Sequence, residues 1–312
     1  MQTGHGPSGV RWWSWGSLGI TLATIVMGAV VRATHSGDGC GRSWPACEGR
    51  LVFPGTDDTA RLIEFSHRMI SGINLVVVAV FVLLVFRAFT AGHPSRRAVV
   101  WTMAFLVFEA GIGAAIVLYG WVAHDYSTAR QVAVPLHLVN TFLLMGALTY
   151  TVWTVHGGAA PAIRGARYLR PLAALAGVLM LIAATGATTS LADTLFAAES
   201  VAEGIRADFH EESAFLVRIR ILHPIFAISG GVLLAWFAWK RLDEVELLGR
   251  PWPARLIIMG VTGQALLGVV HIALLTPLAT GLLHLLIAQT LWVAFVFFAL
   301  TLLEPEPGRR AV

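Results

Sequence analysis

The sequence predicts an all-α integral membrane protein whose eight transmembrane helices form two duplicated four-helix bundles. Three observations favour this fold class. Hydrophobic residues make up 56% of the 312 residues and charged residues only 13%, which a soluble domain's surface cannot accommodate. Eight apolar runs are each about twenty residues long, the length that crosses a hydrocarbon core of about 30 Å. Landmark residues of the first four runs recur in order in the last four.

The apolar runs follow one another with mostly short connections. They span residues 12–33, 62–87, 98–119, 130–155, 168–190, 214–239, 253–275 and 278–303. The segment Met1–Arg11 has one arginine and no small-residue cleavage site. We therefore expect the first run to be a retained helix and not a signal peptide.

The distribution of charge predicts the orientation in the cell membrane, because basic short loops stay cytoplasmic. One set of connections is basic: Arg87, Arg96, Arg97, Arg164, Arg167, Arg170, Lys240, Arg241, Arg250, Arg255, Arg309 and Arg310. The alternate connections are mainly acidic: Asp38, Glu48, Asp57, Asp58, Asp125, Asp193, Glu199, Glu203, Asp208, Glu211 and Glu212. Both termini are expected in the cytoplasm. The net charge of +4 follows from this topology and indicates no nucleic-acid partner.

Four landmark pairs indicate an internal repeat. The pairs are Gly28-Ala29 with Gly186-Ala187, His67 with His223, Glu109-Ala110-x-x-Gly113 with Gln264-Ala265-x-x-Gly268, and His137 with His284. Their offsets are 158, 156, 155 and 147 residues. We expect an N-terminal half at 1–157 and a C-terminal half at 158–312. Because each half has an even number of helices, the two are expected to be related by a pseudo-twofold axis along the membrane normal.

Each predicted half has one histidine in its second helix and one in its fourth, at similar depth near the outer surface. Facing helices of a bundle build cofactor sites, and neutral imidazole is an axial ligand of haem iron. The pattern predicts two bis-histidine haem sites, His67 with His137 and His223 with His284. The alternative, hydrogen bonds between helices, is disfavoured by the fourfold placement. His271 has no counterpart, and we expect it to be a packing or pathway residue.

The halves differ three residues before the first histidine of each pair, where Glu64 and Arg220 stand. A desolvated Glu64 carboxyl can accept a proton or stabilise positive charge on a substrate. It can equally reach water or pair with Arg68 or Arg61. Arg68 and Arg220 are candidates to bond haem propionates, because guanidinium matches carboxylate geometry, or to anchor lipid headgroups.

Three further residues carry chemistry. Glu109 is an intramembrane carboxyl that either relays protons or bonds a neighbouring helix, and we favour the second. Cys40 and Cys47, in the first outer loop, are the only cysteines. On an oxidising face this pair is a disulfide or a redox couple, and the spacing slightly favours a disulfide that staples the loop. The chain has no four-cysteine metal site and no C-x-x-C-H haem attachment motif.

Several motifs now identify a family resemblance. They are Gly28-Ala29-Val30-Val31-Arg32, Ser36-Gly37-x-Gly39-Cys40, Trp44-Pro45-x-Cys47-x-Gly49 and Ile63-Glu64-Phe65-Ser66-His67-Arg68 with Ser71-Gly72. With the later histidines, they resemble the bacterial haem A synthase family, which is related to the mitochondrial enzyme. The resemblance covers all eight helices and is most specific between Gly28 and Gly72.

The resemblance implies an oxidoreductase that converts the C8 methyl group of haem O into the formyl group of haem A by successive hydroxylation, for cytochrome oxidase assembly. It implies haem O on His67 and His137 with Glu64 essential, and haem b on His223 and His284. The outer-loop cysteines correspond to a pair that is linked to activity or haem O transfer in some members. It also implies the lipid bilayer, a haem O synthase and an electron-transfer protein as partners.

The sequence departs from the family pattern at three places. Pro224 follows His223 where arginine is common, and we expect it to kink the helix. Glu109 stands where glutamine is usual, which places an ionisable group near the substrate. The loop between the fifth and sixth helices lacks the second cysteine pair of some members.

Two other functions compete with this interpretation. One is a di-haem b-type electron-transfer cytochrome or quinol oxidoreductase, which would place histidine pairs near both membrane surfaces. The other is a transporter, which would have broken helices at the midplane. Because all four histidines lie toward one surface, the sequence favours the synthase.

Overall fold

The computed structural model describes residues 6–50, 58–161 and 167–305. Within them the fold is all-helical, and eight helices are long and apolar enough to span a membrane: α1 (Ser8–Ala33), α2 (Thr59–Ala88), α3 (Pro94–Leu118), α4 (Thr128–Val155), α5 (Leu169–Leu195), α7 with α8 (Phe215–Lys240), α10 (Trp252–Ala273) and α11 (Leu278–Leu303). The eight predicted spans are confirmed. Asp57, Arg164, Arg309 and Arg310, used to predict the orientation, lie outside the described residues.

Helices α2 and α4 begin directly after a residue whose side chain caps them. The Asp58 carboxylate accepts hydrogen bonds from the backbone N–H groups of Ala60 and Arg61 and caps α2. Ser127 accepts from the N–H of Arg130 and caps α4. These side chains satisfy backbone donors that the first helical turn leaves unpaired.

The sixth span is interrupted. It consists of α7 (Phe215–Ile219) and α8 (Leu222–Lys240), and the break lies at Arg220–Ile221. Proline lacks a backbone N–H and its ring clashes with the carbonyl four residues earlier. For Pro224 that carbonyl belongs to Arg220, so the expected kink is confirmed and lies immediately before His223.

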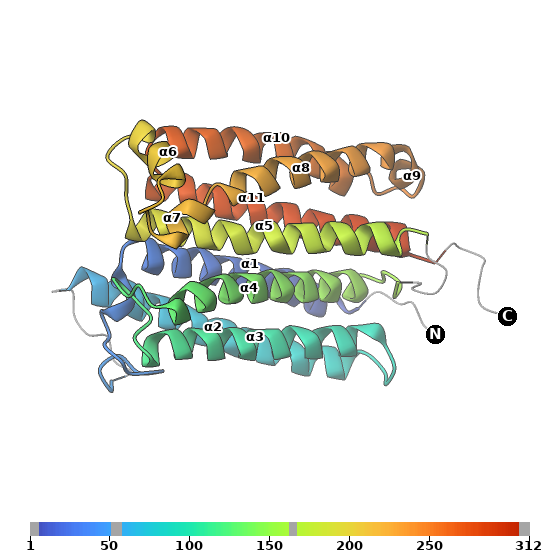
Figure 1. The fold of residues 1–312 in the computed structure, drawn as a ribbon. Coiled ribbons are helices and arrows are strands. Elements are labelled where there is room, and N and C mark those ends of the chain that lie inside the picture. The colour runs from blue at the N-terminus through green and yellow to red at the C-terminus, as the bar shows by residue number, and fades with distance from the viewer. Residues whose placement is uncertain (1–5, 51–57, 162–166, 306–312) are drawn as a thin grey trace.

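Shorter elements close the two ends of the bundle. The 3-10 helix η1 (Ser36–Asp38) and α6 (Val201–Phe209) lie at one end, and α9 (Leu242–Leu247) lies at the other (Figure 1). Because the number of spans is even, α1 begins and α11 ends at the end that carries α9.

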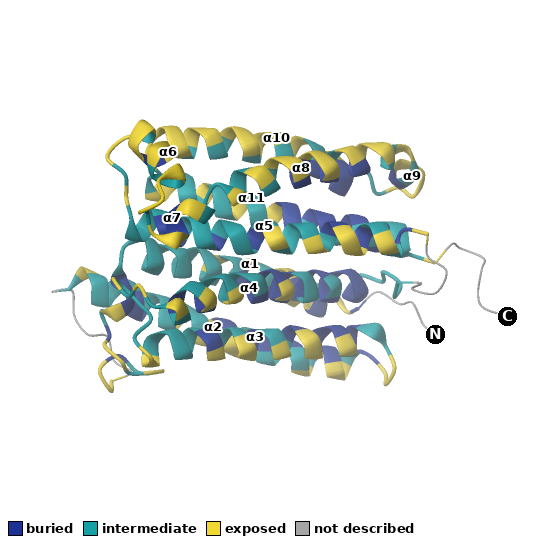
Figure 2. Cartoon of the chain, in the orientation of Figure 1, coloured by how far each residue is buried: buried dark blue, intermediate teal, exposed yellow. Residues whose placement is uncertain are grey.

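Helices α1, α4, α5 and α11 join the two groups of spans. α1 packs against α2, α4 and α11, and α4 packs against α5 and α11. Across this junction the Trp292 indole N–H donates to the carbonyl of Phe142 at 2.6 Å. Buried residues lie mainly along the inward sides of the helices, and many exposed positions lie on outward sides (Figure 2). The exposed ones include large apolar side chains such as Met259 and Val269, as lipid contact requires.

Candidate functional site

Each of the four predicted ligand histidines lies near the start of its helix. His67, His137, His223 and His284 belong to α2, α4, α8 and α11. These are the second, fourth, sixth and eighth spans, which run in the same direction. The four imidazoles therefore lie toward one end of the bundle, the end that carries η1 and α6 (Figure 1).

The two rings of the first pair lie against glycines of neighbouring helices. A Cβ atom built on Gly28 of α1 would lie 3.1 Å from Cε1 and 3.3 Å from Nε2 of His67. One built on Gly113 of α3 would lie 3.8 Å from Cε1 of His137. Gly28 therefore leaves the space that the His67 ring occupies.

The second pair repeats these contacts. A Cβ on Gly186 of α5 would lie 2.9 Å from Cε1 of His223, and one on Gly268 of α10 would lie 3.4 Å from Cε1 of His284. The centroids of the His223 and His284 rings are 6.4 Å apart. When two imidazoles bind one metal ion from opposite sides, their ring centroids are about 6 Å apart, because each metal–nitrogen bond is about 2 Å long and each ring adds its own radius.

The ring nitrogens fit a metal-bound group. The buried Nδ1 atoms of His67, His137 and His284 have no hydrogen-bond partner in the described part of the chain, and Nδ1 of His223 lies 3.4 Å from Oγ1 of Thr185. Buried imidazoles are normally hydrogen-bonded. Two pairs of imidazoles, three of which have a buried ring nitrogen without a partner among the described residues, match the donor set that bis-histidine haem requires.

Glu64 lies one turn before His67, and its carboxylate is buried and fully engaged. Its side chain is 3% exposed. Oε2 accepts the backbone N–H of Cys40 at 2.7 Å, and Oε1 accepts from the Arg68 guanidinium. Of the partners considered from the sequence, Arg68 is therefore the one used, because Arg61 instead pairs with Glu48 at 3.2 Å.

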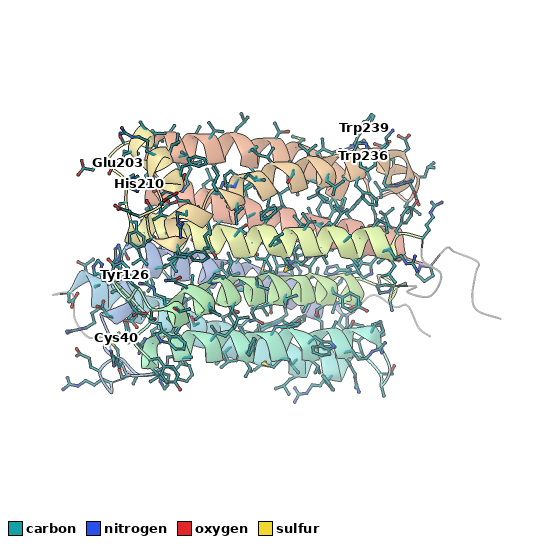
Figure 3. All side chains as sticks on the ribbon, in the orientation of Figure 1. Cys40, Tyr126, Glu203, His210, Trp236 and Trp239 are labelled. Atoms are coloured by element: carbon teal, nitrogen blue, oxygen red, sulfur yellow. A yellow bond between two sulfur atoms is a disulfide. The ribbon has the colours of Figure 1, made fainter. Side chains whose placement is uncertain are left out.

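The loop between α1 and α2 is fastened to α2 by the same two side chains. Nη1 of Arg68 donates to the carbonyls of Ser43 and Ala46 at 2.5 and 2.6 Å. Cys40 and Cys47 form a disulfide, as the spacing favoured, and both are buried against Phe65. Cys40 lies at the same end as Glu203 and His210, the end that holds the histidines (Figure 3).

Arg220 also bonds protein oxygens. Its guanidinium contacts Asp208 at 2.5 Å, Asp193 at 3.0 Å and the carbonyl of Gly204 at 2.7 Å. These bonds fasten α6 to α5 and to the break in the sixth span. The propionate contacts expected of Arg68 and Arg220 stay predictions, since both side chains bond protein oxygens in this structure.

Glu109 of α3 bonds α4, as the sequence favoured. Oε2 accepts from the side-chain amide of Asn140 at 2.5 Å, and Oε1 accepts from the hydroxyl of Thr141. Oε1 also lies 3.3 Å from Nδ1 of His137, an ion-pair distance without hydrogen-bond alignment. In the second group of spans the Gln264 amide donates to the carbonyl of His284 at 3.0 Å and not to its ring.

His271 lies beside the second pair. Its ring is nearly parallel to that of His284, with centroids 6.3 Å apart, and its Nδ1 lies 2.7 Å from Oγ1 of Thr280.

The role of the glycines was not recognised from the sequence, where Gly28, Gly113, Gly186 and Gly268 served only as repeat landmarks. The signal that could have revealed it was their recurrence in the same order with the histidines in both halves of the sequence.

Comparison with known proteins gives a consistent family. Residues 11–296 match the family model COX15-CtaA, described as a cytochrome oxidase assembly protein. A Thermus thermophilus protein named protoheme IX farnesyltransferase is 38% identical over 296 residues, covering 94% of this chain and 48% of that protein.

Two proteins named heme A synthase are also similar. The one from Geobacillus thermodenitrificans is 31% identical over 143 residues, which is 46% of this chain and 44% of that protein. The one from Listeria welshimeri is 31% identical over 140 residues, 44% of this chain and 45% of that protein. The chain therefore spans about half the length of the curated relatives it matches.

Proposed function

This chain belongs to the COX15-CtaA family of cytochrome oxidase assembly proteins, and on that premise we propose that it is a haem A synthase. The reaction is the stepwise oxidation of the C8 methyl group of haem O to the formyl group of haem A. The names of the Geobacillus and Listeria relatives support this activity. The observation that carries the proposal is the set of four histidines, each against a glycine and gathered at one end of the bundle.

Two haem groups would be held by this set. His67 and His137 would bind substrate haem O in an N-terminal half, 1–157, and His223 and His284 would bind a resident haem b in a C-terminal half, 158–312. The matched contacts of Gly28 with His67 and Gly186 with His223 support a duplication of a four-helix unit. Bound haem would supply the redox centre of the reaction.

Glu64 is the acidic group that we assign to the chemistry. It stands three residues before His67, so the two side chains project from one side of α2. A carboxylate at this place, bonded to Arg68, is suited to accept a proton or to stabilise positive charge that develops on the substrate. The Glu64–Arg68 pair also fastens the disulfide loop to α2 at this end of the bundle.

Glu109 is a positioning residue in this proposal. A carboxylate beside the distal nitrogen of a metal-bound histidine fixes the tautomer and the orientation of the ring. The 3.3 Å approach of Glu109 to Nδ1 of His137 fits that role and would direct Nε2 toward the iron. Gln264 has no such contact with the ring of His284, which makes the two sites unequal.

The orientation and the partners follow from the same family. The histidines and the disulfide would face the outer side, with both termini in the cytoplasm, because basic connections stay inside. About half of the Thermus protein named protoheme IX farnesyltransferase matches this chain, which supports a haem O synthase as a partner. The second expected protein partner is an electron-transfer protein.

The experiment is haem extraction and chromatography from a host that makes haem O but no haem A. The parent chain is expected to produce haem A, and Glu64→Ala and Glu64→Gln are expected to abolish it. Glu244→Gln is the matched control, because Glu244 is an ion-paired carboxylate at the opposite end of the bundle. If haem O stays unchanged while the parent protein holds two stable b haems, the chain is an electron-transfer cytochrome instead.

A further inference from the structure

An apolar cavity of about 490 Å³, largely open at the surface of the bundle, lies between α1, α2 and α11. Its size falls within the roughly 300–1,000 Å³ of typical ligand pockets. The residues that matter here are Gly19, Ala23 and Met27 of α1, Ser66 and Ile70 of α2, and Leu286 of α11. The Ser66 hydroxyl is the one polar side-chain group among these residues, and the others offer only apolar surface.

Along α1 and α2 the cavity reaches the level of the first histidine pair. Met27 precedes Gly28, the residue against which the His67 ring lies, and Ser66 precedes His67 itself. Ile70 lies one turn further along α2. An occupant of the cavity would therefore lie along α1 and α2 at the level of a group bound at His67.

Small residues create the space. A Cβ atom built on Gly19 would meet no atom within 4 Å. Shifted by the repeat offset of 158 residues, Gly19 and Ala23 correspond to Gly177 and Leu181, and by 156 residues Ser66 corresponds to Leu222. In the second half, leucine stands at two of these three positions, where the first half has alanine and serine. The small residues that open the space along α1 and α2 therefore belong to the half that we assign to haem O.

We propose that this cavity would hold the farnesyl chain of haem O when His67 and His137 bind its iron. The inference rests on the proposed function. Haem O carries this apolar chain and haem b does not, which matches an open cavity in one half and leucines in the other. A phospholipid acyl chain has the same chemistry and is the competing occupant.

The cavity would orient the substrate more than it would tighten binding. Lipid tails are as apolar as the cavity wall, so the chain gains little by leaving the bilayer. Coordination by two histidines alone would not fix the rotational orientation of a bound macrocycle. A seated farnesyl chain removes that freedom and so selects which methyl group is oxidised.

The test uses the full chain in phosphatidylcholine–phosphatidylglycerol nanodiscs, purified with the haem it retains. Haem O and protohaem IX are titrated into the parent, Gly19→Leu, Ala23→Leu and the repeat-matched control Gly177→Leu, whose added Cβ also meets no atom within 4 Å. The Soret band reports binding, and its circular dichroism reports the orientation of the macrocycle. Retained haem b reports folding of each variant.

In Gly19→Leu and Ala23→Leu we expect the ratio of the haem O to the protohaem dissociation constant to rise about fivefold, a loss of about 1 kcal/mol. The Soret circular dichroism of haem O should change, while protohaem binding and the control stay as in the parent. If the ratio of dissociation constants and the Soret circular dichroism are the same in these two variants as in the parent, the inference is overturned and a phospholipid chain is the occupant of the cavity. If the parent shows the selectivity but never forms haem A, the proposed activity fails and the cavity assignment stands.

Discussion

Replacing Glu64 by alanine should release the disulfide loop from α2, whatever its effect on the reaction. The substitution removes the acceptor of the Cys40 N–H and the carboxylate partner of Arg68, whose side chain is 8% exposed. Breaking a buried ion pair costs about 3–5 kcal/mol because one charge stays behind. In the variant, Arg68 keeps its hydrogen bonds to the carbonyls of Ser43 and Ala46. Because these bonds still compensate part of its charge, we take the lower end of this range.

A cost of about 3 kcal/mol raises the population of the open loop roughly a hundredfold. The assay is hydrogen–deuterium exchange of the backbone amides of residues 36–50, with the protein in nanodiscs. Glu64→Gln keeps a neutral acceptor for the Cys40 N–H and should accelerate exchange only about tenfold, since hydrogen bonds to charged groups are roughly twice as strong as neutral ones.

Glu48→Ala is the matched control within the same loop. Its partner is Arg61, and the two side chains are 53% and 31% exposed, so the pair contributes at most about 1 kcal/mol. Exchange at residues 36–50 that is equal in the parent and in Glu64→Ala would refute the fastening role. Loss of haem A in the same variant would then assign Glu64 to the chemistry alone.

Three more outcomes follow from the structure. Alanine substitutions of the four glycines should lower the haem content most where the added Cβ would lie nearest a histidine ring. We expect the largest loss at Gly186 (2.9 Å), a smaller one at Gly28 (3.1 Å), and little at Gly268 (3.4 Å) and Gly113 (3.8 Å). Pyridine haemochrome assays measure the haem content, and equal losses at all four positions would contradict the prediction. Glu109→Gln should weaken haem retention at the first pair about tenfold, as loss of a partner of a metal-bound histidine typically does, and should shift its electron paramagnetic resonance signals, whereas a purely structural role would leave those signals in place. Burial lowers the pKa of His93, whose Nδ1 accepts the Ser95 N–H at the start of α3. The neutral form therefore stabilises the fold above the unfolded pKa of about 6.5, and as pH falls through the lower folded pKa the amides in the first turn of α3 should lose protection against hydrogen exchange. His93→Asn keeps a cap and should abolish this pH dependence.

Much of the fold was predictable because it depends on distances along the chain. The length of each apolar run sets whether a helix can cross the bilayer, and all eight spans were found within a few residues of their ends. The position of each histidine within its run sets its depth, so the common end of His67, His137, His223 and His284 also followed from the sequence. Pro224 marked the break in the sixth span for an equally local reason.

The contacts between helices were decided only by the tertiary structure. These helices are apolar on nearly every side, so the sequence does not indicate which face of a helix meets its neighbour. The choice of Arg68 over Arg61 for Glu64, the ion pairs of Arg220 with Asp193 and Asp208, and the glycine beneath each histidine ring depend on how the helices are rotated about their axes. The sequence determined how deep each functional group lies, and only packing determined what each group touches.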